Sequence, residues 1–319
     1  MDNSVIKLIS VVLPVYNEED NIYKLYNELV AVLNDLAYDY ELLWINDGSS
    51  DKSAEILNSL AKSDNKCKVI NFRRNFGQTA AMSAGIKLAQ GEIVIPMDAD
   101  LQNDPQDIPH LVAKINEGFD VVSGWRYARH DKLFTRKLPS WLANYMIRLI
   151  TGVKLHDYGC SLKAYRREVI KNISLYGEMH RFIPAYAAWQ GARITEIKVN
   201  HRPRYTGKTK YGLSRTFKVI LDLVVIKFMA NYLDRPIHFF GGLGLGAGFL
   251  GLITAGLALW FKIDLDVSLS RTPLPILAAM LIIVGVQLLG MGILAEMLMR
   301  TYYKEQHKDP YIIKDQSNF

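Results

Sequence analysis

The residues best suited to catalysis or metal binding are acidic and directly follow strand-like runs. Asp98 and Asp100 stand two residues apart at the end of the apolar run 93–96. Two such carboxylates can share a divalent ion with a diphosphate, because hard cations take oxygen ligands from carboxylates and from substrate phosphates. An isolated Asp-x-Asp triplet is also typical of a solvated turn. The position of this one, with Asp47 and Glu18 after other strand-like runs, favours the metal–diphosphate interpretation.

The elements that would position these residues alternate between strand and helix. Apolar residues recur at helical spacing from Ile22 to Leu36, and Asp104 before Pro105 indicates a capped helix start. This alternation predicts an α/β fold, with a mainly parallel sheet covered on both faces and a ligand beyond the carboxyl ends of the strands. Strands are expected at 8–13, 42–45, 69–72, 93–96 and 121–123.

The loops at these strand ends exclude two common nucleotide sites. The first strand is followed by Pro14, Tyr16 and Glu18 rather than by a Gly-x-Gly-x-x-Gly fingerprint, and no Walker lysine loop is present. Acidic and aromatic residues suit a sugar nucleotide whose phosphates are held by a metal.

Composition narrows the possible partners. The chain has 319 residues, of which 50% are hydrophobic and 22% charged, so a disordered protein is excluded. The net charge of +6 is compatible with nucleic acid, an anionic membrane or phosphate-bearing substrates. Basic residues fall in several short groups, which favours a membrane and phosphates over nucleic acid. The two cysteines, Cys67 and Cys160, are too few and too far apart for a disulfide framework or a zinc site.

Two apolar runs, 237–261 and 275–299, are candidate membrane spans. The first carries no formal charge, and only Gln287 and Glu296 interrupt the second. At ~1.5 Å per residue each covers roughly 37 Å, enough to cross a membrane with some tilt. The linker 262–272 is too short for a domain, so a hairpin is expected. A pair of buried core helices is the alternative.

Charges beside the hairpin predict its orientation. The positive-inside bias places both ends in the cytoplasm, although Lys262 and Arg271 in the linker dilute the signal. The residues on which this rests are Arg235, Arg300, Lys304 and Lys308. The glycines at 242, 244, 246 and 248 permit close helix packing, within the hairpin or between protomers of a homo-oligomer. The segments 138–149 and 217–229 are basic and apolar, as in interfacial helices, although the first could equally be a core helix.

At this point the sequence resembles a known family. The segments 12–18, 46–51 and 97–102 are similar to the motifs of family 2 (GT-A fold) glycosyltransferases. The segments 73–78, 157–163 and 204–211 resemble those of polyprenyl-phosphate glycosyltransferases, such as dolichol-phosphate mannose synthases, bactoprenol glucosyltransferases and the undecaprenyl-phosphate aminoarabinose transferase. The resemblance covers about Ser10 to Asn231, and the two spans match the bactoprenol glucosyltransferase branch.

The resemblance implies roles on the donor side. A nucleotide pocket would be lined by Pro14, Tyr16 and Glu18, with Asp47 in contact with uridine. Asp98 and Asp100 would hold Mg²⁺ or Mn²⁺ against the diphosphate, so that Asp98 also belongs to the nucleotide-sugar site.

On the reaction side, Gln102 would lie beside the donor sugar and Asp157 near the reacting carbon. Three cations would close over phosphate charge as a mobile loop, and two arginines would contribute to the acceptor phosphate. These are Arg204, Lys208 and Lys210 in the loop, and Arg126 and Arg129. By themselves, three cations in seven residues are also typical of a solvated loop.

These observations and the resemblance together predict a membrane-bound inverting glycosyltransferase of a bacterial inner membrane. A hexose, expected to be glucose from UDP-glucose, would pass to undecaprenyl or another polyprenyl phosphate at the cytoplasmic face. GDP-mannose, UDP-GlcNAc and a UDP-aminoarabinose are alternative donors. We expect a catalytic domain over 1–212, an interfacial helix or linker over 213–235, two spans over 236–300 and a cytoplasmic tail over 301–319. The whole site would lie before Asn231.

Two other functional classes are less favoured. A processive polysaccharide synthase would need a Gln-x-x-Arg-Trp motif, whereas here Gln190 and Arg193 are followed by Ile194. Two spans are also too few to enclose a channel. A non-catalytic nucleotide-sugar sensor should have lost part of the site, and no expected site residue is missing from the sequence.

Overall fold

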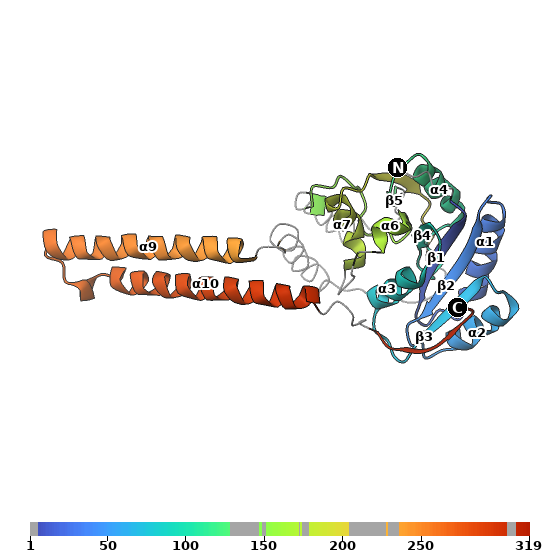
Figure 1. The fold of residues 1–319 in the computed structure, drawn as a ribbon, viewed down its shortest axis with the longest axis horizontal. Helices are drawn as coiled ribbons and strands as arrows, with labels where there is room; N and C mark the ends of the chain where they lie inside the picture. The colour runs from blue at the N-terminus through green and yellow to red at the C-terminus, as the bar shows by residue number, and fades with distance from the viewer. Residues whose placement is uncertain are drawn as a thin grey trace. The chain divides into compact units, whose positions relative to one another are not determined.

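The computed structural model describes residues 6–127, 147–148, 151–171, 173, 179–203, 228, 236–304 and 311–319. Two compact units are present (Figure 1). One comprises residues up to Val224 together with 309–319, and the other runs from Val225 to Lys308. Of the two predicted interfacial helices, only residues 147–148 of 138–149 and Phe228 of 217–229 are described, so neither prediction is tested.

The first unit is built on an eight-stranded sheet in the order β7-β5-β6-β4-β1-β2-β3-β8. Strands β1 to β5 and β7 run in one direction, and β6 and β8 run against their neighbours. The carboxyl ends of β1 to β5 and β7 therefore meet at one edge of the sheet, called here the carboxyl edge. The strands are β1 (Leu8–Val15), β2 (Asp39–Asn46), β3 (Cys67–Phe72), β4 (Ile93–Pro96), β5 (Val121–Arg126), β6 (Lys163–Arg166), β7 (Ile194–Val199) and β8 (Ile313–Ser317).

Helices cover both faces of this sheet. One face packs against α1 (Ile22–Asn34), α2 (Ser53–Ser63) and α4 (Ile108–Asn116). The other packs against α3 (Gln78–Leu88), α6 (Arg167–Ile170) and α7 (Ile183–Trp189). The short helices η1 (Pro105–Asp107) and η3 (Met179–Phe182) complete this unit as far as it is described. The predicted α/β architecture with helices on two faces is confirmed.

Local sequence explains the central elements. Every residue of β2 after Asp39 is buried, as expected for a strand covered on both faces. In α1, Ile22, Leu25 and Leu29 follow helical spacing and are buried against the sheet. The predicted cap is also present, because the side chain of Asp104 accepts a hydrogen bond from the backbone N–H of Gln106 at 3.1 Å.

The C-terminal residues return to the first unit. Within the segment expected as a tail, Ile313–Ser317 forms β8, which pairs antiparallel with β3 at the sheet edge (Figure 1). The ring of Tyr311 stacks on Phe72, with centroids 5.0 Å apart. The side chain of Asn318 donates to the carbonyl oxygens of Ala61 at 2.6 Å and Cys67 at 2.8 Å. These contacts fasten the chain end to β3 and to the end of α2.

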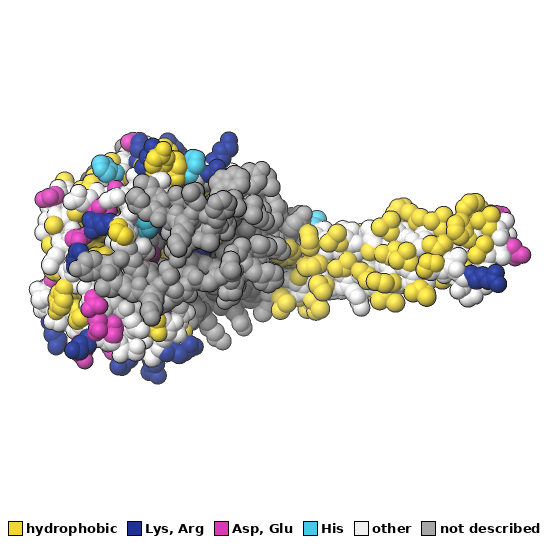
Figure 2. Space-filling model, turned by 180° about the vertical axis from the view of Figure 1, so that it is seen from behind, with side chains coloured by type: hydrophobic (Ala, Val, Ile, Leu, Met, Phe, Trp, Pro, Cys, Tyr) yellow, Lys and Arg dark blue, Asp and Glu magenta, His cyan; other side chains and the backbone are white. Residues whose placement is uncertain are grey.

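The second unit contains two long apolar helices, α9 (Pro236–Asp264) and α10 (Leu274–Lys304), joined through the turn η4 (Leu269–Arg271). Both are long and apolar enough to cross a membrane. Their large apolar side chains are exposed, for example 66% for Leu245 and 76% for Ile276, and they line the visible face of the hairpin in Figure 2. Core helices of a soluble protein would bury such side chains, so the core-helix alternative does not fit.

Glycines allow the two helices to pack closely. A Cβ at Gly244 would lie 2.8 Å from the carbonyl oxygen of Gly285, and one at Gly285 would lie 3.0 Å from the backbone nitrogen of Gly248. Gly242 and Gly246 have open space around their Cβ positions. The sequence left open whether these glycines pack within the hairpin or between protomers. In the structure, Gly244 and Gly248 pack within the hairpin.

Candidate active site

Most of the predicted site residues lie at the carboxyl edge of the sheet. Pro14 is in β1, Tyr16 and Glu18 follow it, and Asp47 follows β2. Asp98, Asp100 and Gln102 follow β4, Arg126 ends β5, and Asp157 precedes β6. The remaining predicted cations, Arg129, Arg204, Lys208 and Lys210, lie outside the described residues.

The Asp98–Asp100 segment lies at the centre of this edge. A carboxylate oxygen of Asp98 accepts a hydrogen bond from the side-chain amide of Gln78 at 2.6 Å. Burial and, to a smaller extent, the negative charge of Asp100 together raise the pKa of Asp98 to about 6. Leu101 then adopts a left-handed backbone with φ of 61°. This uncommon conformation turns the chain so that Asp100 accepts from the backbone N–H of Gln102 at 3.1 Å.

These two carboxylates fit a divalent cation. The negative charge of Asp100 raises the cost of ionising Asp98, and a bound dication would offset that cost. Among the described residues there is no cluster of three or more His, Cys, Asp or Glu side chains that could hold a metal by themselves. A cation at Asp98 and Asp100 would therefore take its other ligands from water or a bound diphosphate, as Mg²⁺ commonly does.

Asp157 forms a two-pronged ion pair with Arg126. The Nε and Nη2 atoms of Arg126 donate to the two carboxylate oxygens at 2.6 and 2.9 Å. The backbone N–H of Gly159 donates to the same carboxylate at 3.0 Å. Asp157 is only 4% exposed. Because both oxygens accept charge-assisted bonds, the carboxylate is fixed in position and stabilised as an anion.

A second cation lies close to this pair. Lys163 is buried, and its ammonium group donates to the carbonyl oxygens of Cys160 and, at 3.3 Å, Tyr158. Burial lowers the pKa of Lys163, and the negative charges of Asp157 and Asp98 act in the opposite direction. The site thus combines buried acidic and basic groups within one electrostatic network.

The loops after β2 and β3 form the adjoining part of the site. The two carboxylate oxygens of Asp47 accept from the backbone N–H groups of Phe76 at 2.7 Å and Gly77 at 2.9 Å. Gly48 has φ of +65°, and a Cβ there would lie 2.3 Å from the carbonyl carbon of Arg74. Asp47 therefore holds the loop after β3, and Gly48 lets that loop approach closely.

The loop after β1 is tied to the loop after β2. The backbone N–H of Asn17 donates to the hydroxyl of Ser49 at 3.0 Å, and the N–H of Glu18 donates to Ser53 at 3.0 Å. Glu18 also accepts from the side chain of Asn21 at 2.6 Å. Tyr16 is 37% exposed, which leaves its ring accessible at the carboxyl edge of the sheet.

Gln78 links the two parts of the site. It is the first residue of α3, beside the backbone N–H groups held by Asp47, and its side chain reaches Asp98. A molecule that bound the loops after β2 and β3 at one end would therefore have its other end near the acidic pair.

Gln102 is held by the chain that precedes the basic loop. The carbonyl oxygen of Gln102 accepts from the backbone N–H of Arg202 at 2.9 Å. The Arg202 guanidinium bonds Asp104 at 2.7 Å and Glu28 at 2.6 Å. Arg202 therefore anchors the start of the segment that leads to residues 204–210.

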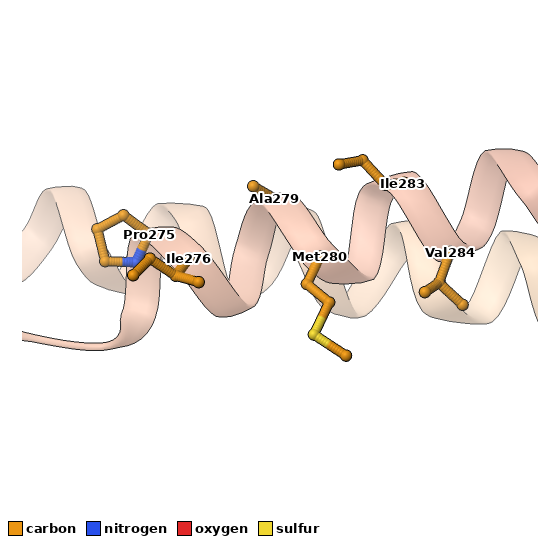
Figure 3. Close-up of a pocket in the computed structure, with 6 residues that line it drawn as sticks. All are labelled: Pro275, Ile276, Ala279, Met280, Ile283 and Val284. Carbon is orange, nitrogen blue, oxygen red and sulfur yellow. The ribbon is translucent and has the colours of Figure 1, made fainter.

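An apolar hollow lies on α10 (Figure 3). Side chains of one helix line it, and they offer neither charge nor strong hydrogen-bonding groups to a nucleotide. They are Pro275, Ile276, Ala279, Met280, Ile283 and Val284.

Sequence comparison identifies the family. The sequence model described as glycosyl transferase family 2 matches residues 10–174, which carry most of β1, all of β2 to β6 and the acidic pair. This chain belongs to glycosyltransferase family 2.

Relatives extend over the apolar helices as well. The dodecaprenyl-phosphate galacturonate synthase of Rhizobium johnstonii is 45% identical over 312 residues, which cover 96% of this chain and 92% of that protein. The undecaprenyl-phosphate 4-deoxy-4-formamido-L-arabinose transferase of Aeromonas hydrophila is 39% identical, with 98% and 95% covered. These relatives are transferases of sugars to polyprenyl phosphates by name.

Solved structures confirm the GT-A fold of this family 2 enzyme. Glucosyl-3-phosphoglycerate synthase of Mycobacterium tuberculosis, in complex with Mn²⁺, UDP and glucosyl-3-phosphoglycerate, matches with a TM-score of 0.54 at 17% identity, over 71% of this chain and 80% of that one. Mannosyl-3-phosphoglycerate synthase of Rubrobacter xylanophilus matches with a TM-score of 0.55 at 15% identity, over 70% and 74%. At these identities the likeness concerns the fold.

Several residues of the candidate site were not singled out from the sequence. Gln78 and Lys163 lie within quoted motifs, but no local pattern distinguishes them from their neighbours. Ser161 hydrogen-bonds to Asp98 and accepts from Asn103 at 2.8 Å. Arg202 stands two residues before the basic loop, where its proximity to that loop was an available but weak signal.

Proposed function

We propose that this enzyme transfers a sugar from a uridine-nucleotide donor to a polyprenyl phosphate, and that the sugar is galacturonate or a 4-amino-4-deoxyarabinose derivative. The observation that carries this proposal is similarity to two such transferases over nearly the whole chain, apolar helices included. The glucose donor expected from the sequence is less well supported than the aminoarabinose alternative. Galacturonate is placed first because the relative named for it has the higher identity, 45% against 39%.

The donor would span the two parts of the site. Its nucleotide would lie on the loops after β1, β2 and β3, with Tyr16 as a neighbouring ring and with Pro14 and Glu18 shaping the pocket. Because Asp47 already holds two backbone N–H groups, any contact it makes with the base would use its remaining acceptor capacity. Asp98 and Asp100 would hold Mg²⁺ or Mn²⁺, which neutralises charge on the leaving diphosphate.

The acceptor chemistry suits a fixed Asp157. A phosphate monoester has a second pKa of about 6, so it is mostly a dianion at neutral pH and requires no base to become a nucleophile. Asp157, held in the Arg126 fork, would position the reactants or stabilise positive charge developing on the sugar ring. Direct displacement would invert the anomeric configuration.

Cations would offset repulsion between the acceptor and the donor diphosphate. Arg126 lies beside Asp157, and Arg129, Arg204, Lys208 and Lys210 are proposed to contribute from segments outside the described residues. Gln102 would contact the donor sugar from the turn after Asp100. Such alignment and preorganised charge are the main catalytic contributions expected here.

The membrane assignment follows from the same relatives and from α9 and α10. We propose that these helices anchor the catalytic unit at the cytoplasmic face of a bacterial inner membrane, as the positive-inside pattern indicates. The domain limits 1–212, 213–235 and 236–300 belong to this proposal. Homo-oligomers could form through the face of α9 that contains Gly242 and Gly246.

A donor screen tests the proposed function. The full-length protein is incubated with undecaprenyl phosphate and, in turn, UDP-galacturonate, UDP-4-deoxy-4-formamido-arabinose, UDP-glucose, UDP-GlcNAc and GDP-mannose, with and without chelator. We expect lipid-linked product from one of the first two donors and loss of activity with chelator. Preferred use of UDP-glucose would overturn the sugar assignment, full activity in chelator would overturn the metal assignment, and no transfer from any donor would favour a sensor.

A further inference from the structure

The C-terminal strand contacts the donor side of the site by two routes. On one face of β3, Tyr311 stacks on Phe72 at 5.0 Å and with an interplanar angle of 11°. Phe72 in turn meets Phe76 edge-to-face at 5.7 Å. The backbone N–H of Phe76 is one of the two groups bound by Asp47. An aromatic stack thus joins Tyr311, two residues before β8, to the loop after β3.

The second route runs along the other face of β3. The side chain of Asn71 donates to Asp315 of β8 at 2.6 Å and accepts from the side chain of Asn46 at 2.8 Å. The side-chain oxygen of Asn46 accepts from the backbone N–H of Ser49 at 3.0 Å. Ser49 also accepts from the N–H of Asn17. A relay of hydrogen bonds therefore connects β8 to the loops after β2 and β1.

Both routes end on backbone that shapes the proposed nucleotide pocket. In addition, the backbone N–H of Arg73, the first residue after β3, donates to the carbonyl oxygen of Ile312 at 3.2 Å. The ladder between β3 and β8 is irregular between Asn71 and Phe72. Such an irregularity bends a strand and re-aims the residues that follow it. The C-terminal segment therefore contacts the end of β3. The direction of β3 at this point sets the path of the loop that follows it.

We propose that the C-terminal segment 311–317 is a positioning element of the donor site. Through Tyr311 and Asp315 it holds the loops after β1, β2 and β3 in the conformation that binds the donor nucleotide; this inference rests on the proposed function. It also means that the donor site extends beyond Asn231, since a chain ending there would lack β8 and leave β3 as an open edge.

The test compares substitutions along the C-terminal segment in the full-length protein. Tyr311→Ala removes the stacked ring, whereas Tyr311→Phe keeps it. Asp315→Ala removes the nearer of the two acceptors of the Asn71 amide, the other being Asn58 at 3.2 Å, whereas Asp315→Asn keeps an oxygen there. Gln316→Ala is the matched control, because Gln316 is exposed on the same strand. Binding of UDP and of GDP is measured by calorimetry, and KM and kcat are measured with the donor that the wild type uses.

We expect Tyr311→Ala and Asp315→Ala each to weaken nucleotide binding and raise the donor KM about fivefold, the effect of losing one modest contact. The polyprenyl-phosphate KM and kcat should stay within about twofold of wild type, as expected for loss of donor binding alone. Tyr311→Phe, Asp315→Asn and Gln316→Ala should bind as wild type does. A merely structural role would lower the yield of active enzyme without changing the donor KM.

Two different failures can be distinguished. If the wild type binds and Tyr311→Ala and Asp315→Ala bind equally well, or if kcat falls while the donor KM is unchanged, the positioning role is wrong and the proposed function stands. If the wild type binds neither UDP nor GDP and transfers no sugar, the proposed function fails and this inference fails with it.

Discussion

At the scale of single residues, the pairing of Asp157 with Arg126 decides what the buried carboxylate can do. Its oxygens accept from Nε at 2.6 Å and Nη2 at 2.9 Å, and from the Gly159 N–H at 3.0 Å. A general base must offer a lone pair to the proton it removes. Asp157 instead offers its lone pairs to a permanent cation, which fits a role in positioning and charge stabilisation.

A pH–rate profile tests this role. Asp157→Asn should slow transfer roughly 100-fold, because the Arg126 fork is lost and the reactants are misplaced. The rate of both proteins should fall as the pH drops below about 6, because the acceptor phosphate takes up a proton there. Disappearance of this acidic limb in Asp157→Asn would identify Asp157 as the titrating base and contradict the account.

Gly48 makes the second residue-scale prediction. Ala at this position would combine an unfavourable φ of +65° with a Cβ only 2.3 Å from backbone of the loop after β3. Gly191→Ala is the matched control, since Gly191 lies between α7 and β7 and has φ of +88° but open space around its Cβ position.

Both substitutions should destabilise by about 1–2 kcal/mol through the left-handed backbone. Only Gly48→Ala should also displace the loop after β3 and raise the donor KM, by tenfold or more. The clash is with backbone, so it is relieved only if the loop moves away. Thermal unfolding and donor kinetics of the two variants provide the comparison. Equal donor KM values would show that the close approach of the two loops is not needed for binding.

At the scale of elements, the hairpin depends on close approach of α9 and α10. Gly244→Leu would place a side chain against the backbone of Gly285, 2.8 Å from the Cβ position, whereas Gly246→Leu would enter open space. We expect Gly244→Leu to lower the unfolding temperature of the solubilised protein by several degrees, and Gly246→Leu to leave it unchanged. If Gly246→Leu instead converts an oligomer to monomers, the Gly242–Gly246 face joins protomers. Equal stability of both variants would contradict the packing described.

Elements also show what the sequence could and could not predict. The central strands β1 to β5 were predictable because each is an apolar run that is buried by helices on both faces. The strand β8 has the sequence IKDQS, and three of its five residues are exposed, so its only signal is a partner more than 200 residues away. In the site, Asp98 and Asp100 could be recognised as a pair because they are two positions apart in the sequence. The Arg126–Asp157 pair joins residues 31 positions apart and required the fold.

At the scale of the whole molecule, the chain passes between the two units twice. The chain leaves the catalytic sheet before α9 and returns to it as β8 after α10. A soluble fragment made by cutting before α9 would therefore lack one strand of the sheet.

The most direct test of the central claim is the mass of the lipid product. The full-length protein is given undecaprenyl phosphate and the donor selected by the screen, with the donor labelled separately in its sugar and in its β-phosphate. The account predicts a lipid heavier than the acceptor by one sugar residue, carrying the sugar label alone and the inverted anomeric configuration. A product that also carries the β-phosphate label, or nucleotide release without any lipid product, would contradict it.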